Sequence, residues 1–269
     1  MKPRFFPPTA ASASFTLVEM LVAVTVLALI MVFVVQFVSL ASRSTINDGK
    51  KIEAVSQARQ AFDRFGLDWN AHVSRGDVPV AFLKNGGNDE ISFMTEMPSP
   101  DGSRSVAVVD YRIDTNSAQL ERGISGYNWN GSGLAPFTLT NLPSLQETNF
   151  QALSPGVFRM EFCLLSKASA TNAPQYWWPA GTSQISSLTN VAAVLVAVAA
   201  LDDASRKLIT TNQLENLAAA FPDMETNDPV AAWQALLSQP NFASAARVPL
   251  VVAQAVRVYE RYFYVTIAP

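Results

Sequence analysis

A long apolar run near the N-terminus constrains this chain more than any other feature. Phe15 to Leu40 is almost wholly apolar, and Met20 to Ser42 carries no charge until Arg43 closes the run. A helix needs about 20 apolar residues to cross a bilayer. Lys2 and Arg4 precede the run, and positive charge on that side keeps the N-terminus in the cytoplasm. The sequence therefore predicts one spanning helix, with everything after Arg43 outside the cytoplasm.

Two ordinary interpretations of this run compete. A secretory signal peptide has an apolar region of about 7–15 residues and a small-residue cleavage site. This run is longer, and Ser39-Leu40-Ala41 is a poor site. A plain signal anchor fits the length but leaves the one carboxylate, Glu19, unexplained. An acid at a bilayer centre costs roughly 2.5–3.5 kcal/mol, although Glu19 lies about one turn from the start of the run, where it can reach the interface.

The residues around Glu19 account for all of these features together. Ser14-Phe15-Thr16-Leu17-Val18-Glu19-Met20-Leu21 resembles the cleavage and methylation signal of type IV prepilins and type II secretion pseudopilins. The resemblance implies that residues 1 to 14 are a leader, that the new terminus Phe15 is N-methylated, and that Glu19 pairs with a terminal amine during filament assembly. A neighbour's ammonium relieves the cost of a carboxylate in lipid. The family nearly always has glycine before the cleaved bond, where this chain has Ser14.

A second helical pattern follows the span without a proline break. Apolar residues recur at spacings of three and four, which predicts one apolar stripe along a helix: Ile52, Val55, Ala58, Phe62, Phe65 and Trp69. The simplest expectation is a single helix from about Phe15 to Trp69. Its first half would lie in lipid or a filament core, and its second half would lie against a sheet.

Strand-like and helix-like segments alternate further along. We expect a hairpin of strands 106–113 and 119–124, a strand over 158–164, a central strand or buried helix over 191–201, and a closing strand over 254–267. Helices are expected over 212–220 and from Pro229 to about Leu237, with Asp228 as N-cap. Residues 125–155 read as surface loop. The predicted class is α+β and pilin-like: a long N-terminal helix packed on an antiparallel sheet domain with a helical insert.

Two stretches narrow the resemblance. VSQARQAFDRFGLDW (55–69) and VVDYRIDTNSAQLERG (108–123) are similar to the J-type minor pseudopilins, which cap the type II secretion pseudopilus, and the chain also looks like the Verru_Chthon cassette C-type prepilin-like proteins. The resemblance divides the chain into a leader (1–14), a span or filament-core helix (15–42) and an extracytoplasmic domain (43–269). It implies four partners: a prepilin peptidase/N-methyltransferase, other pilins or pseudopilins, an inner-membrane assembly platform, and membrane lipid.

Catalysis and nucleic-acid binding have little support in the sequence. The single histidine, His72, follows the long helix among polar residues, so we expect a solvated surface side chain. The single cysteine, Cys163, lies in an apolar strand pattern, where a buried thiol is commoner than a nucleophile. One histidine and one cysteine do not make a zinc site. The net charge is -3 and no basic tract occurs, which argues against a nucleic-acid partner.

Acidic pairs and one aromatic cluster remain as candidate binding residues. Asp89-Glu90 and Asp202-Asp203 offer oxygens of the kind that calcium takes. Neither pair has EF-hand spacing, so we expect solvated surface charge and no cofactor. Trp177-Trp178, between prolines, is either an exposed contact patch or a cover over a core edge, and we favour the cover.

The sequence thus predicts a membrane-inserted prepilin-like subunit, not an enzyme, built into or onto a filament and placed at its tip because a bulky domain is awkward to repeat. The alternative is a signal-anchored extracytoplasmic domain that binds a sugar or protein through Trp177 and Trp178 and never polymerises.

Overall fold

The computed structural model describes residues 16–75, 78, 80–84, 87–98, 106–127, 145–169, 172–178, 184–185 and 188–265. The predicted leader, with Ser14 and Phe15, lies outside the described residues. The chain divides into two compact units, an N-terminal unit of residues 1–49 and a C-terminal unit of residues 50–269.

Helix α1 extends from Leu17 to Asn70 and contributes to both units. The expectation of one helix over this whole stretch is confirmed. Its segment Leu17–Ser42 is 26 residues long, is apolar enough to cross a membrane, and has no buried residue. The N-terminal unit is therefore a helix that lacks a packed face within the described part of its own chain.

The second half of α1 buries a stripe that differs from the predicted one at its start. Ala58, Phe62, Phe65 and Trp69 are buried, as are Ala54 and Ala61, but Ile52 is 69% exposed and Val55 is 46% exposed. The 3, 3, 4 spacing explains the error, because a helix turns about 100° per residue and two steps of three carry Ile52 about 120° around the axis from Ala58. The assignment of Ile52 and Val55 to the buried stripe is wrong.

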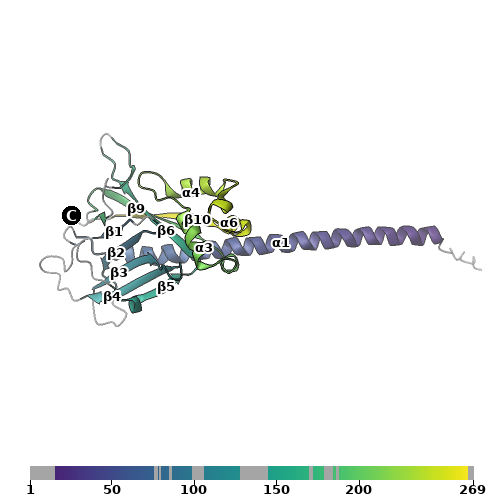
Figure 1. Cartoon of the computed structure of the whole chain (residues 1–269), viewed down its shortest axis with the longest axis horizontal. Helices are drawn as coiled ribbons and strands as arrows, with labels where there is room; N and C mark the ends of the chain where they lie inside the picture. The colour runs from purple at the N-terminus through teal and green to yellow at the C-terminus, as the bar shows by residue number, and fades with distance from the viewer. Residues whose placement is uncertain are drawn as a thin grey trace, which may run out of the picture. The chain divides into compact units, whose positions relative to one another are not determined.

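Two antiparallel sheets make up most of the C-terminal unit (Figure 1). The first has the order β5-β4-β3-β2-β1-β8, with β1 Ala81–Leu83, β2 Glu90–Thr95, β3 Val106–Ile113, β4 Leu120–Tyr127, β5 Phe150–Ser154 and β8 Gln184–Ile185. The second has the order β10-β9-β6-β7, with β6 Val157–Ser166, β7 Tyr176–Trp177, β9 Val191–Ala200 and β10 Arg257–Tyr264.

The predicted hairpin is confirmed as β3 and β4, paired from Val106↔Tyr127 to Ile113↔Leu120. The prediction of loop over 125–155 is wrong at both ends, because β4 continues to Tyr127 and a short 3-10 helix, η2 (Glu147–Asn149), leads into β5. Among the described strands β5 pairs only with β4, at the sheet edge, and its middle residues are exposed. Little apolar patterning therefore marks β5 as a strand in the sequence.

The helical insert packs on the second sheet. It contains α2 Asp203–Arg206, α3 Thr211–Ala219, α4 Pro229–Leu237, α5 Phe242–Ala245 and α6 Leu250–Ala255. Asp228 caps α4 by accepting the Ala231 N–H at 3.0 Å, as predicted. The predicted closing strand from Gln254 begins too early, because Gln254 belongs to α6 and β10 starts at Arg257.

The core has two layers, one on each face of the second sheet. On one face, side chains of β6 and β9 meet α1 and the first sheet. On the other face, Phe158, Ala197 and Ala199 meet the helical insert. Strand β9 is thus a central strand covered on both sides, which explains its continuous apolar sequence. The α+β class is confirmed, and the arrangement is consistent with a pilin-like fold.

Candidate functional site

Glu19 caps the start of α1. Its Oε2 accepts the backbone N–H of Thr16 at 2.9 Å and the Thr16 hydroxyl at 3.1 Å, while the Glu19 N–H donates to Thr16 Oγ1 at 3.3 Å. This reciprocal pair is a capping box, which satisfies donors that a helix start otherwise leaves free. The sequence pattern of a capping box, Thr16-x-x-Glu19, is present, but the sequence-based predictions did not include this arrangement. Glu19 therefore has a structural role in its own chain.

His72 is not the solvated surface side chain that we expected. Its ring stacks on Trp69 with centroids 4.6 Å apart, its Nδ1 lies 2.6 Å from the Trp69 carbonyl oxygen, and its backbone bridges to Thr95. The end of α1 turns directly into the first sheet here, and the ring is covered by Trp69 from three residues earlier. Burial lowers the pKa of His72 below 6.5, and the hydrogen bond to the carbonyl opposes this shift.

We expect the NMR titration of His72 to show a pKa below the ordinary histidine value. It is the only histidine, so its ring gives one set of signals in the intact chain. Because burial disfavours the charged ring, its contribution to stability is present above pH 6.5 and is lost as the pH falls through the folded-state pKa. The same signal in the urea-unfolded chain is the control. Equal pKa values in the two states would contradict the buried, stacked placement.

In each of the two acidic pairs that were predicted to be solvated, one residue is buried. Asp89 is 1% exposed, and Glu90 begins β2. Asp202 is also 1% exposed and caps α2 by accepting the Ser205 N–H at 2.9 Å. Asp203 is exposed, as predicted, and pairs with Lys207 at 2.5 Å. The surface prediction is wrong for Asp89 and Asp202. An ion pair with Lys84 allows the Asp89 carboxylate to be buried, and the helix cap allows the Asp202 carboxylate to be buried.

Cys163 is buried, as expected. Its thiol donates to the Met224 carbonyl oxygen at 3.2 Å, and burial raises its pKa. Trp178 is 5% exposed and packs in the core with Trp177 against it, so the prediction that this pair covers a core edge is confirmed.

A buried cluster of charges, which we call the ion cluster, joins the first sheet, β6 and the α3–α4 loop. Lys84 Nζ contacts both Asp89 Oδ2, at 2.9 Å, and Glu161 Oε1. Arg159 contacts Glu161 Oε2 at 2.8 Å and also Asp223. The side chains of Arg159 and Glu161 are completely buried. The alternation of apolar residues along β6 predicted the strand but gave no sign of this cluster.

The backbone completes the ion cluster. Asp89 Oδ2 accepts the Phe162 N–H at 2.7 Å, and Glu161 Oε1 accepts the Met224 N–H at 2.9 Å. Burial raises the pKa of Glu161 to about 8 and that of Asp89 to about 6, with Lys84 opposing both shifts. One oxygen each from Asp89, Glu161 and Asp223 lie within 4.8 Å of one another, as metal ligands would. Lys84 and Arg159 already contact these three carboxylates, so the geometry favours an internal ion network over a metal site.

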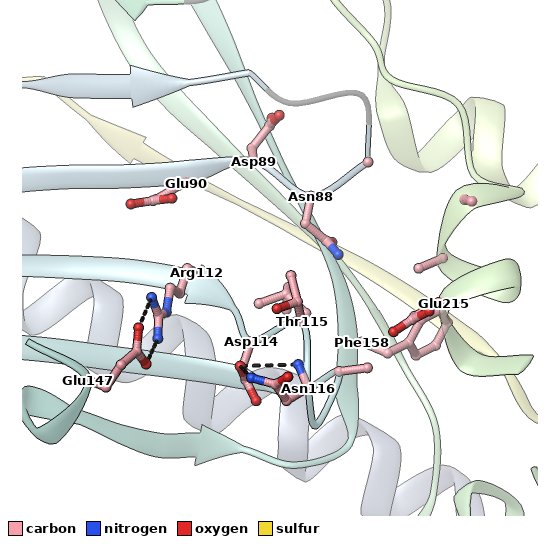
Figure 2. A pocket seen from close by; sticks show the side chains of 15 residues that line it. Asn88, Asp89, Glu90, Arg112, Asp114, Thr115, Asn116, Glu147, Phe158 and Glu215 are labelled. Atoms are coloured by element: carbon pink, nitrogen blue, oxygen red, sulfur yellow. Dashed lines mark hydrogen bonds and ion pairs between the residues drawn. The ribbon is translucent and has the colours of Figure 1, made fainter. Parts of the chain in front are cut away.

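An acidic cavity of about 480 Å³ lies between the β3–β4 turn, the segment before β2, η2 and α3. Its charged lining is Asp89, Glu90, Arg112, Asp114, Glu147 and Glu215. Figure 2 shows Glu147 paired with Arg112 and Asp114 beside Asn116, while Glu215 lies on the opposite side.

Most of the charges around this cavity already have partners in the chain. Arg112 is held by Glu147 and lies over the Phe150 ring, 3.6 Å from its centroid. Asp114 accepts the backbone N–H of Asn116 at 3.2 Å and of Ser117 at 2.8 Å, and so shapes the turn. The volume of the cavity is that of a ligand pocket. Its polar groups, however, make hydrogen bonds and ion pairs within the chain, and the geometry therefore assigns the cavity no ligand.

No protein-family model matches this chain, and no curated protein matches its sequence.

Proposed function

We propose that this chain is a prepilin-like structural subunit of the minor pseudopilin kind. In this proposal it is cleaved before Phe15, N-methylated there, and assembled into a type II secretion pseudopilus or a type IV pilus-like filament, at the tip. The observation that carries the proposal is α1, which is apolar and unburied over Leu17–Ser42 and buries its later residues in an α+β core. A helix with this division is suited to lateral packing against other helices while the domain selects partners.

The position of Glu19 supports the assembly step. Its carboxylate is exposed, and its hydrogen bonds to the described residues are made with Thr16, three positions away. An ammonium group makes a stronger, charge-assisted bond with a carboxylate than a hydroxyl or amide does. In the proposed filament, the terminal amine of a neighbouring subunit replaces the Thr16 donors to Glu19. The capping box is then the arrangement of the unassembled subunit.

The proposal fixes location and partners. The N-terminus is cytoplasmic, the helix crosses the inner membrane, and the C-terminal unit is periplasmic or extracellular. The partners are the prepilin peptidase/N-methyltransferase, sibling pilins or pseudopilins, the inner-membrane assembly platform and lipid. The chain itself carries out no reaction and requires no cofactor.

The rival function, a signal-anchored binding domain, would use a different site from the one first considered. Trp178 is buried, so the tryptophan pair is not a ready contact surface. The acidic cavity beside Asp114 and Glu215 is a remaining hollow that such a function could use, but most of its charged groups are paired within the chain.

Intact mass and N-terminal sequencing of the protein from its native membrane test the proposal. We expect a chain that starts at Phe15 and carries one methyl group. A start at Met1 would contradict processing and leave a signal anchor. A start after Ala41 would mean an ordinary secreted domain, and the filament function would be wrong.

We expect Glu19→Ala to be processed normally but to enter filaments poorly. A hydrogen bond to a charged group contributes about 1.5–3 kcal/mol, so the assembled fraction should fall about tenfold or more. Quantifying the protein in sheared filament fractions measures this effect.

Thr16→Ala is the matched control for Glu19→Ala, because it removes the two hydroxyl hydrogen bonds of the capping box but keeps the carboxylate. We expect its assembly to stay near that of the wild type. If the two variants assembled equally badly, Glu19 would act only as a helix cap.

A further inference from the structure

Five large aliphatic side chains are exposed at the end of the C-terminal unit where its chain begins. We call them the basal patch. They are Ile52 (69% exposed) and Val55 (46%) on α1, Leu208 (55%) after α2, and Leu250 (60%) and Val251 (49%) on α6.

Contacts within the C-terminal unit bring these residues to one end. The Asp203 N–H at the start of α2 donates to Glu53 Oε1 at 3.1 Å, which holds α2 beside the first turn of this unit's helix. Leu208 follows α2 directly, with its N–H bonded to Ser205 at 3.1 Å. Helix α6 in turn contacts α2. These contacts place the patch residues of α2 and α6 at the end where the chain enters the unit.

The length of the connecting chain limits how far this end can lie from the span. The apolar segment ends at Ser42 and the C-terminal unit begins at Lys50, so seven residues, 43–49, join them. Seven residues reach at most about 25 Å when fully extended. If Leu17–Ser42 crosses a membrane, this connection keeps the entry point of the C-terminal unit, where Ile52 lies, within about 25 Å of the end of the span.

We propose that the basal patch inserts into the interfacial layer of the membrane that holds the span. Aliphatic side chains held in this way enter the boundary between headgroups and acyl chains. The charges nearby are mixed: Lys51, Lys207 and Arg247 are cationic, and Glu53 and Asp203 are anionic. Insertion is therefore apolar and does not require anionic lipid. This inference rests on the span alone and goes beyond the proposed filament function, since it holds equally for a signal anchor.

Quenching of a site-specific fluorophore by lipid tests the inference in the full-length chain. The variant Leu250→Cys is labelled and placed in phosphatidylcholine nanodiscs with or without brominated acyl chains. Native Cys163 is buried and serves as an unlabelled background, checked by labelling the wild type. Leu67→Cys is the matched control, because Leu67 is 58% exposed and lies about 22 Å further along α1 than Ile52.

We expect at least about twofold more quenching at Leu250 than at Leu67, because insertion reaches about 5–10 Å into the boundary layer. Equal quenching at the two positions would overturn the inference and leave the patch for a protein partner. A second set uses Leu208→Cys as reporter with Leu250→Glu and Val251→Glu. Quenching at Leu208 should then fall to the Leu67 level, with an unchanged unfolding midpoint because both changed residues are exposed.

Two further outcomes of this experiment decide the mechanism. Quenching that persists at Leu208 in the double glutamate variant would contradict insertion through α6. Quenching that appears only when phosphatidylglycerol is added would contradict apolar insertion. Because neither readout depends on cleavage before Phe15 or on assembly, the inference and the filament proposal fail separately.

Discussion

Replacing Glu161 with alanine should destabilise the C-terminal unit by about 3–5 kcal/mol, the usual effect of removing one partner of a buried ion pair. Glu161 is the shared acceptor for Lys84 and Arg159, and its side chain is completely buried. Its removal leaves a buried guanidinium and a nearly buried ammonium short of a counter-charge, and it leaves the Met224 N–H without its carboxylate acceptor. Denaturant unfolding of the full-length chain at about pH 9, where Glu161 is ionised because its pKa is about 8, measures the loss through tryptophan fluorescence.

Lys207→Ala is the control for this loss. It also removes a salt bridge, but the Lys207 and Asp203 side chains are 74% and 60% exposed. Surface pairs contribute about 0–1 kcal/mol, so this variant should unfold almost like the wild type. Similar losses in the two variants would mean that burial of the ion cluster does not set its contribution.

Glu161→Gln tests the protonation of the same site. Burial raises the pKa of Glu161 to about 8 from an ordinary value of 4.5. The folded state therefore binds this proton more tightly, and its contribution to stability is complete below about pH 4.5 and is lost as the pH rises to about 8. Glutamine cannot titrate, so the wild type should lose stability relative to Glu161→Gln across this range. A difference that stays constant with pH would contradict the raised pKa.

Phe65→Ala should also destabilise the unit by about 3–5 kcal/mol, because truncating a buried phenylalanine removes apolar contacts and leaves a cavity. The Phe65 ring is 2% exposed and lies 4.7 Å from the Phe263 ring, 5.1 Å from Tyr111 and 5.7 Å from Trp69, measured between centroids. It thus joins α1 to both sheets. The same unfolding experiment measures the effect.

Val55→Ala is the control for Phe65→Ala, because the helical periodicity of the sequence assigns both residues to one buried stripe. In the structure Val55 is 46% exposed. Exposed substitutions usually change stability by no more than about 0.5 kcal/mol, so Val55→Ala should be nearly silent. A large loss would mean that the periodic stripe, and not the observed packing, describes the buried face.

Local signals in the sequence predicted those elements whose residues carry their own pattern. The apolar run that continues into α1, the alternation along β6, the β3–β4 hairpin and the Asp228-Pro229 start of α4 all follow from patterns within a few neighbouring residues. The capping box at Thr16 and Glu19 belongs to the same group, since its signal is local even though it was not recognised. The edge strand β5 has no such pattern and was missed.

Only the tertiary structure decided which charged and polar side chains are buried. Arg159 and Glu161 alternate with apolar residues along β6. Taken alone, this pattern predicts a strand with one solvent-exposed face. That face is covered because the helical insert packs on it, and Lys84, Asp89 and Asp223 arrive there from distant parts of the chain. Asp68 on α1 is buried in the same way, by Arg122 at 2.5 Å and the Tyr111 hydroxyl at 2.5 Å.

The physical reason for this division is the distance along the chain between interacting groups. A helix period, a cap or a turn depends on residues that are at most a few positions apart, so the sequence by itself determines it. Burial of a charge is favourable only when its partners are in place, and for Glu161 one partner, Lys84, lies 77 residues away. The burial of the charged face of β6 therefore depends on the tertiary structure, which brings those partners together.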